Sequence, residues 1–94
     1  MESNILKKEI IKHDWYFIVY RDLNEKYTLS AAFNQRSYIN HLNMIKNFGK
    51  VIAVKEGATK EDRVPVDELI KGVHEKKIKN LETELLRLNF TLPR

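Results

Sequence analysis

The chain has 94 residues, a formal net charge of +4, a sequence pI of about 9.4 and no cysteine. That length predicts a single domain, residues 1–94, with a modest hydrophobic core. Disulfides, thiolate catalysis and cysteine-based zinc sites are excluded. Hydrophobic residues make up 43% of the chain and charged residues 32%, which is typical of a folded globular protein and argues against disorder.

The first elements are a short helix and a hairpin. Ser3 is a suitable cap for a helix that runs to about Lys12. Residues 15–20 are six consecutive aromatic or β-branched residues and predict a buried strand. Residues 26–33 alternate between larger apolar and smaller side chains, which predicts a second strand that pairs with the first across a polar turn.

The next helix has clear signals at both ends. Asn34 is a good N-cap, and Gly49 stands where a left-handed residue commonly ends a helix, so we expect a helix over 35–48. Residues 50–55 predict a third strand and 56–63 a loop. A short edge strand at 64–66 is expected to contain Pro65, which cannot donate to a ladder.

The last predicted element is a long helix that Asp67 caps and that runs to about Asn89. The complete prediction is an α+β fold. It has a small, mostly antiparallel sheet of three or four strands, packed by three helices, with a long C-terminal helix.

The distribution of charge gives the main functional hint. Residues 26–55 contain five lysines or arginines and no Asp or Glu, whereas acidic residues occur on both sides of this stretch. Such an asymmetry gives one face of a protein a preference for acidic partners.

Helix 35–48 concentrates this charge on one side. At 100° per residue, its polar arc contains only side chains that donate to phosphates or pair with base edges. With the nearby Lys50, the predicted binding residues are Gln35, Arg36, Asn40, Asn43, Lys46, Asn47 and Lys50. A solvated helix face is the alternative interpretation, although such faces normally mix both signs of charge.

The C-terminal helix predicts self-association. Its apolar residues follow heptad-like spacing over about two heptads. A helix of this length would overhang a small domain and expose that seam, which favours a homodimer. The predicted oligomerisation residues are Ile78, Leu81, Leu85 and Leu88. The alternative is that the seam packs on the protein's own sheet.

Three other features favour structural roles. The lysines at 7–12 and 76–79 are typical of solvated helices, although they are able to contact phosphate. The aromatic residues at 15–33 are more often core than base-stacking platforms. His13, His41 and His74 have no metal-ligand spacing, and His41 lies on the apolar side of helix 35–48, where a hydrogen-bonded structural role is expected.

The sequence therefore predicts a small non-catalytic regulatory protein without a cofactor or metal. It would self-associate through its C-terminal helix and bind nucleic acid, DNA included, through the acid-free face. The alternative is an inhibitor or adaptor that docks an acidic protein surface. No signal peptide or membrane-length apolar run is visible, so a cytoplasmic location is expected.

Overall fold

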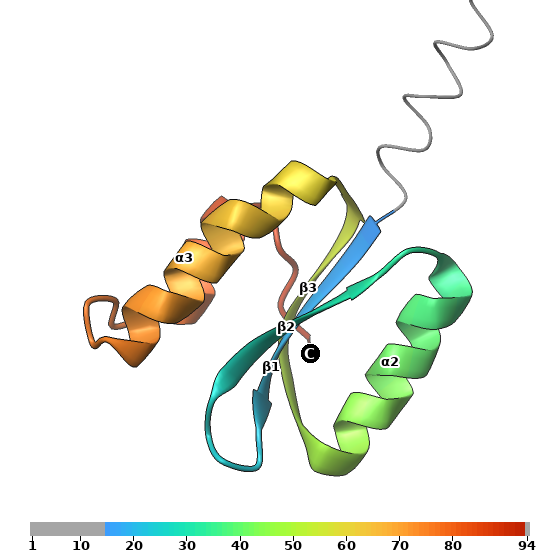
Figure 1. Ribbon diagram of the computed structural model, residues 1–94, viewed down its shortest axis with the longest axis horizontal. Helices are drawn as coiled ribbons and strands as arrows, with labels where there is room; N and C mark the ends of the chain where they lie inside the picture. The colour runs from blue at the N-terminus through green and yellow to red at the C-terminus, as the bar shows by residue number, and fades with distance from the viewer. Residues whose placement is uncertain (1–14, 94) are drawn as a thin grey trace, which may run out of the picture.

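The computed structural model describes residues 15–93, and the predicted helix at 3–12 lies outside them. Three antiparallel strands form the sheet: β1 (Trp15–Asp22), β2 (Tyr27–Ala32) and β3 (Gly49–Ala58), in the order β2-β1-β3. The predicted hairpin and the α+β class are confirmed. Figure 1 shows helix α2 (Gln35–Phe48) on one side of the sheet and α3 (Arg63–His74) on the other.

Alternation along β1 builds two separate cores. Phe17 and Val19 face α3 and α4 (Leu81–Arg87), and they form one buried cluster with Val66, Leu85 and Phe90. Ile18 faces the opposite side, where Ala32 and Ile45 are also buried. The thin sheet is thus covered on both faces, which explains why the run at 15–20 is apolar without interruption.

Helix α2 has the predicted bounds because its cap forms as expected. The side chain of Asn34 accepts a hydrogen bond from the backbone N–H of Ser37 at 2.8 Å. The predicted left-handed conformation of Gly49 is wrong, since its φ of −173° and ψ of −170° are extended. Gly49 is needed for space instead: a Cβ there would lie 2.6 Å from the carbonyl oxygen of Arg21.

The predicted long C-terminal helix is wrong, because the segment folds as two helices. Helix α3 begins at Arg63 after a 3-10 turn, η1 (Lys60–Asp62), so residues 64–66 are helical and Asp67 is not a cap. Pro65 is tolerated in the first turn, where its missing N–H has no intrahelical partner. Helix α4 starts only after Asn80, whose side chain accepts from the backbone N–H of Thr83.

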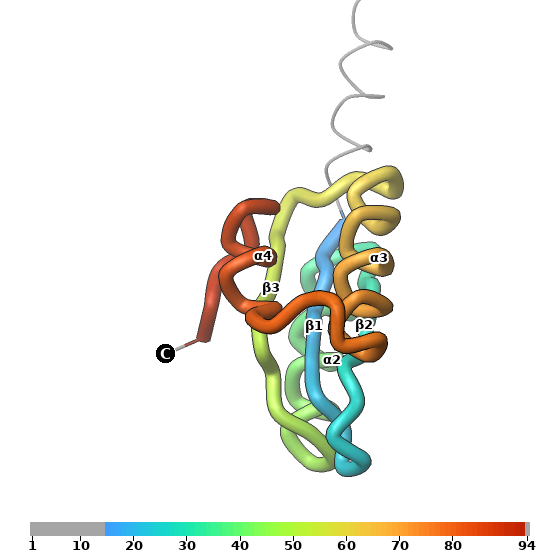
Figure 2. The backbone as a smooth tube through the Cα atoms, turned by 90° about the vertical axis from the view of Figure 1, so that its left-hand side faces the viewer, coloured from blue at the N-terminus to red at the C-terminus, as the bar shows by residue number. Residues whose placement is uncertain are grey.

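The two helices take different positions on the sheet. Figure 2 shows α3 over β2 and α4 beside β3. After α4 the chain returns to the sheet, where Thr91 and Val54 exchange two backbone hydrogen bonds of 2.7 and 2.9 Å at the outer edge of β3. β3 also carries an extra residue, Gly57 with φ 67°, opposite Trp15 and Tyr16. None of the helices within residues 15–93 is long and apolar enough to cross a membrane.

Candidate nucleic-acid interface

Helix α2 is held on the sheet by aromatic and polar contacts on its inner side. The Tyr38 ring stacks on Tyr16, with centroids 4.8 Å apart and planes 16° apart. At the other end of the helix, Phe48 meets Tyr20 edge-on at 5.8 Å. Between them, His41 Nδ1 lies 3.2 Å from Ser30 Oγ, so the expected structural role of His41 is supported. These contacts fix which side of α2 faces outward.

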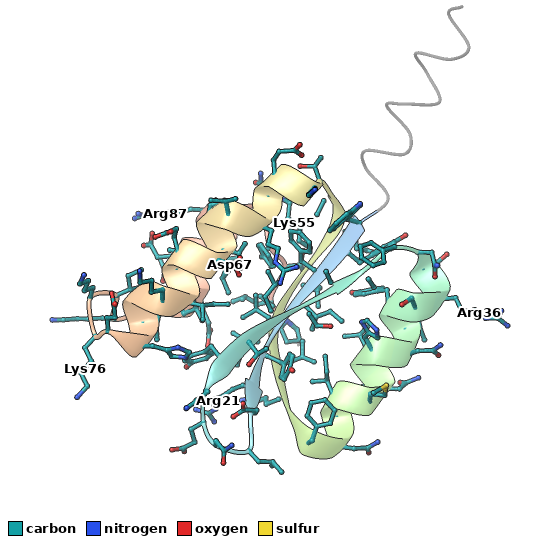
Figure 3. All side chains as sticks on the ribbon, in the orientation of Figure 1. Arg21, Arg36, Lys55, Asp67, Lys76 and Arg87 are labelled. Atoms are coloured by element: carbon teal, nitrogen blue, oxygen red, sulfur yellow. The ribbon has the colours of Figure 1, made fainter. Side chains whose placement is uncertain are left out.

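The outward side of α2 carries the predicted binding residues. All seven of them are exposed: Gln35, Arg36, Asn40, Asn43, Lys46, Asn47 and Lys50. The helix contains no carboxylate, and Figure 3 shows Arg36 extending away from the sheet. Among residues 15–93 the ion pairs involve other cations, namely Lys55, Arg63, Lys77 and Arg87. The six helical residues therefore form one exposed surface of amide and cationic groups, with the exposed Ile39 among them, and we call this surface the α2 face.

Lys50 does not belong to the α2 face itself. It pairs with Arg21 across β1 and β3, so the two side chains start from the same face of the sheet. Phe17, Val19 and Arg21 are every second residue of β1, so they share one face of the sheet. Phe17 and Val19 face α3 and α4, which places Lys50 on the side of the sheet away from α2. Lys50 nonetheless reaches the end of the helix, because it lines a hollow of about 320 Å³ together with Lys46 and Asn47.

Carboxylates lie near both ends of α2. Asp22 and Glu25 line the same hollow as Lys46. Near the other end, Glu56 acts on Tyr38: burial, the Glu56 carboxylate and Tyr16 together raise the pKa of the Tyr38 phenol above its usual value. Lys46, one of the two cations of the α2 face, thus has carboxylates nearby, and the exposed arc between Arg36 and Lys46 carries uncharged amides.

The predicted oligomerisation residues lie mostly inside the protein. Leu81 is 5% exposed and Leu85 is fully buried in the core that α3 and α4 share with the sheet. Leu88 packs against the same core, and Ile78 packs over Gly72. The prediction assumed one long helix that overhangs the sheet. The segment instead folds as two helices, and the apolar residues of the second helix pack onto the sheet. Self-association itself stays a prediction.

The aromatic residues divide between core and surface. Phe17 is buried, and Trp15 meets Phe33 edge-on with centroids 4.6 Å apart. Phe33 is 61% exposed at the end of β2, next to the first turn of α2. Among the aromatic residues at 15–33, Phe33 is therefore the one that a role in the core does not explain.

The structure also joins two segments that are distant in sequence, which sequence reasoning missed. The backbone N–H of Tyr27 donates to His74 Nε2 at 3.2 Å, and the two rings stack with centroids 6.3 Å apart. This contact joins the β1–β2 turn to the end of α3 across 47 positions of sequence. No local pattern predicts such a contact.

Within residues 15–93 no group of three or more His, Asp or Glu side chains is arranged to hold a metal ion. No model of a protein family, no curated protein and no solved structure matches the chain.

Proposed function

We propose that this protein is a small, non-catalytic regulatory protein that binds nucleic acid through the α2 face. One observation carries the proposal: all the polar residues on the exposed arc of a firmly packed helix are Gln, Asn, Arg or Lys. Lysine and arginine neutralise phosphates, while Asn, Gln and Arg pair with base edges. The major groove of DNA is about 12 Å wide and admits a helix.

A second candidate function is docking to an acidic protein surface. It is favoured by Ile39 and Met44, which are 48% and 57% exposed. At 100° per residue Ile39 lies inside the polar arc of α2, between Lys46 and Asn43, and Met44 lies at its edge. Apolar side chains beside a basic arc suit a partner that offers both apolar and acidic groups. We place nucleic acid first because the other residues of the arc are all Gln, Asn, Arg or Lys.

Binding is measured by fluorescence anisotropy with a labelled 20-base-pair duplex and a labelled single strand, between 20 and 200 mM salt. For the wild type, the logarithm of the affinity should fall linearly with the logarithm of salt concentration. The double variant Arg36→Ala/Lys46→Ala should lower that slope by about two. Its matched control is Lys60→Ala/Arg63→Ala, which removes two exposed cations at the start of α3 and should leave the slope unchanged.

If neither probe binds at 20 mM salt, the nucleic-acid proposal is wrong and the acidic-protein alternative takes its place. If the control pair lowers the slope as much as the α2 pair, binding is a diffuse response to net charge. That result would remove α2 as the interface.

A further inference from the structure

The turn between β1 and β2 lies between the C-terminal ends of α2 and α3 (Figure 1). On one side it meets Lys46 and Lys50 at the hollow described above. On the other side, the contact between Tyr27 and His74 joins it to the last turn of α3. We call this region the basic end, and its cations are Arg21, Lys26, Lys46, Lys50, Lys71, Lys76 and Lys77.

Four carboxylates share the basic end with these seven cations, and one of them, Glu82, lines a hollow with Lys50. Asp22 is engaged by the turn, since its Oδ1 accepts from the backbone N–H groups of Asn24 and Lys26. Glu75 lies 3.3 Å from Lys77. Glu25 is exposed at the tip of the turn. The basic end thus keeps an excess of three positive charges, drawn from the β1–β2 hairpin, β3 and the ends of two helices.

Lys76 occupies a backbone conformation that does not suit lysine. Its φ is 63°, and it stands at the C′ position of a Schellman motif. The N–H of Lys76 donates to the carbonyl of Val73, and the N–H of Lys77 donates to that of Gly72. Glycine or asparagine is favoured at this position because a Cβ is strained there.

The end of α4 offers a direct comparison. Asn89 has φ 68° and stands at the same position of a second Schellman motif, with N–H groups of Asn89 and Phe90 donating to the carbonyls of Leu86 and Leu85. There the chain uses a residue that tolerates the left-handed region. At the end of α3 it uses lysine, and in the β1–β2 turn Glu25 has the same φ of 63°. Strain of this kind is found at functional positions.

We propose that the basic end holds the phosphate backbone of a nucleic acid. This inference rests on the proposed function and deepens it: Lys46 is common to both surfaces, so a strand that crosses the β1–β2 turn continues onto the α2 face. The basic end would then supply phosphate contacts without sequence preference, and the amides of α2 would supply base contacts.

The test separates stability from binding with two matched variants. Lys76→Gly and Asn89→Gly each remove the Cβ from a left-handed residue in a Schellman motif. Lys76→Gly should raise the melting temperature by several degrees, and Asn89→Gly should raise it less, because asparagine already tolerates this conformation. Only Lys76→Gly removes a phosphate contact, so only it should lower the salt slope for the labelled duplex, by about one. If Lys76 had a purely structural role, the Lys76→Gly protein would not be more stable than the wild type and also bind the duplex more weakly.

Three outcomes overturn the inference. If Lys76→Gly binds with the wild-type slope, the basic end does not contact phosphate, even though binding through α2 survives. If the wild type binds no duplex or single strand at 20 mM salt, the proposed function and this inference fall together. If Lys76→Gly loses binding only to vesicles that contain phosphatidylserine, and not to nucleic acid, the basic end is a membrane-contact surface instead.

Discussion

His74 accepts a hydrogen bond from the backbone N–H of Tyr27, with Nε2 3.2 Å from the nitrogen. In this contact Nε2 is the acceptor and the backbone N–H is the donor. Tyr27 begins β2, an edge strand, and its N–H points away from β1. The last turn of α3 therefore covers the first outward donor of that edge, where an unpaired strand would otherwise invite pairing with another chain.

Replacement of His74 by phenylalanine tests this contact. His74→Phe keeps an aromatic ring against Tyr27 and removes the acceptor, so the free energy of unfolding should fall by about 1 kcal/mol. Hydrogen exchange should show faster exchange of the Tyr27 amide. The control Tyr27→Phe keeps both the backbone donor and the ring, and it should leave the stability nearly unchanged. Equal protection of the Tyr27 amide in His74→Phe and wild type would contradict the role given to His74.

Two glycines should respond differently to alanine. In Gly49→Ala the new Cβ would lie 2.6 Å from a backbone oxygen, that of Arg21, so the cost should be about 1–3 kcal/mol. In Gly72→Ala it would meet Cδ1 of Ile78 at 2.6 Å, and Ile78→Val removes that atom. The double variant Gly72→Ala/Ile78→Val should therefore recover much of the loss, helped by the higher helix propensity of alanine. Urea unfolding measures both effects, and rescue of Gly49→Ala by a side-chain change would contradict the backbone explanation.

The sequence predicted α2 to the residue because its signals are local. Asn34 caps its own helix, and the outward arc follows from a periodicity of 3.6 residues. Local signals failed to predict the end of α3 at His74. Glycine is the usual residue in the left-handed position after a helix, and here that position is occupied by Lys76. The gap without apolar residues at 74–77 was visible in the sequence, and it marks the place where α3 ends.

The candidate site was predictable only in part, for the same reason. The α2 face belongs to one helix, so its residues could be predicted from sequence periodicity without knowledge of the tertiary structure. The basic end needs the contact between Tyr27 and His74, whose partners lie 47 residues apart and belong to unremarkable segments. The burial of Leu85 likewise depends on where the break in the helix directs α4, which spacing alone does not reveal.

Lys55 is a cation with a structural role. Its Nζ donates to the carbonyl of Leu88 at 2.9 Å and lies 3.8 Å from Oδ2 of Asp62, and its side chain is only 16% exposed. It thus ties the end of α4 and the η1 turn to β3. Lys55→Met should lower the free energy of unfolding by about 1–3 kcal/mol, because it leaves a carbonyl without its charged donor. Lys60→Met, at an exposed position nearby, is the matched control in urea unfolding, and an equal loss in both variants would show that charge alone matters.

Ionisation of Tyr38 should lower the free energy of unfolding at alkaline pH. Its pKa is raised in the folded protein by burial, by Glu56 and by Tyr16, so the folded state holds this proton more tightly than the unfolded state. The contribution is complete below the unfolded pKa of about 10 and is lost as pH rises from there through the folded pKa. Tyr38→Phe should flatten the decline in unfolding free energy above pH 10, and Glu56→Gln should move the Tyr38 titration, followed at 295 nm, to lower pH. A Tyr38 titration unchanged in Glu56→Gln would exclude the carboxylate as a cause.

Substitution of Leu85 and Leu86 tests whether the apolar residues of α4 pack in the core of one chain or join two copies of the chain. Leu85 is fully buried and Leu86 is 50% exposed on the same helix. Leu85→Ala should therefore lower the free energy of unfolding by about 2–5 kcal/mol, because it leaves a cavity among Phe17, Val66 and Phe90. Leu86→Ala should change it by less than about 0.5 kcal/mol. Sedimentation at high concentration separates the alternatives. If Leu85→Ala dissociates a dimer and leaves the stability of the monomer unchanged, the α4 seam joins two copies and the core position given to it here is wrong.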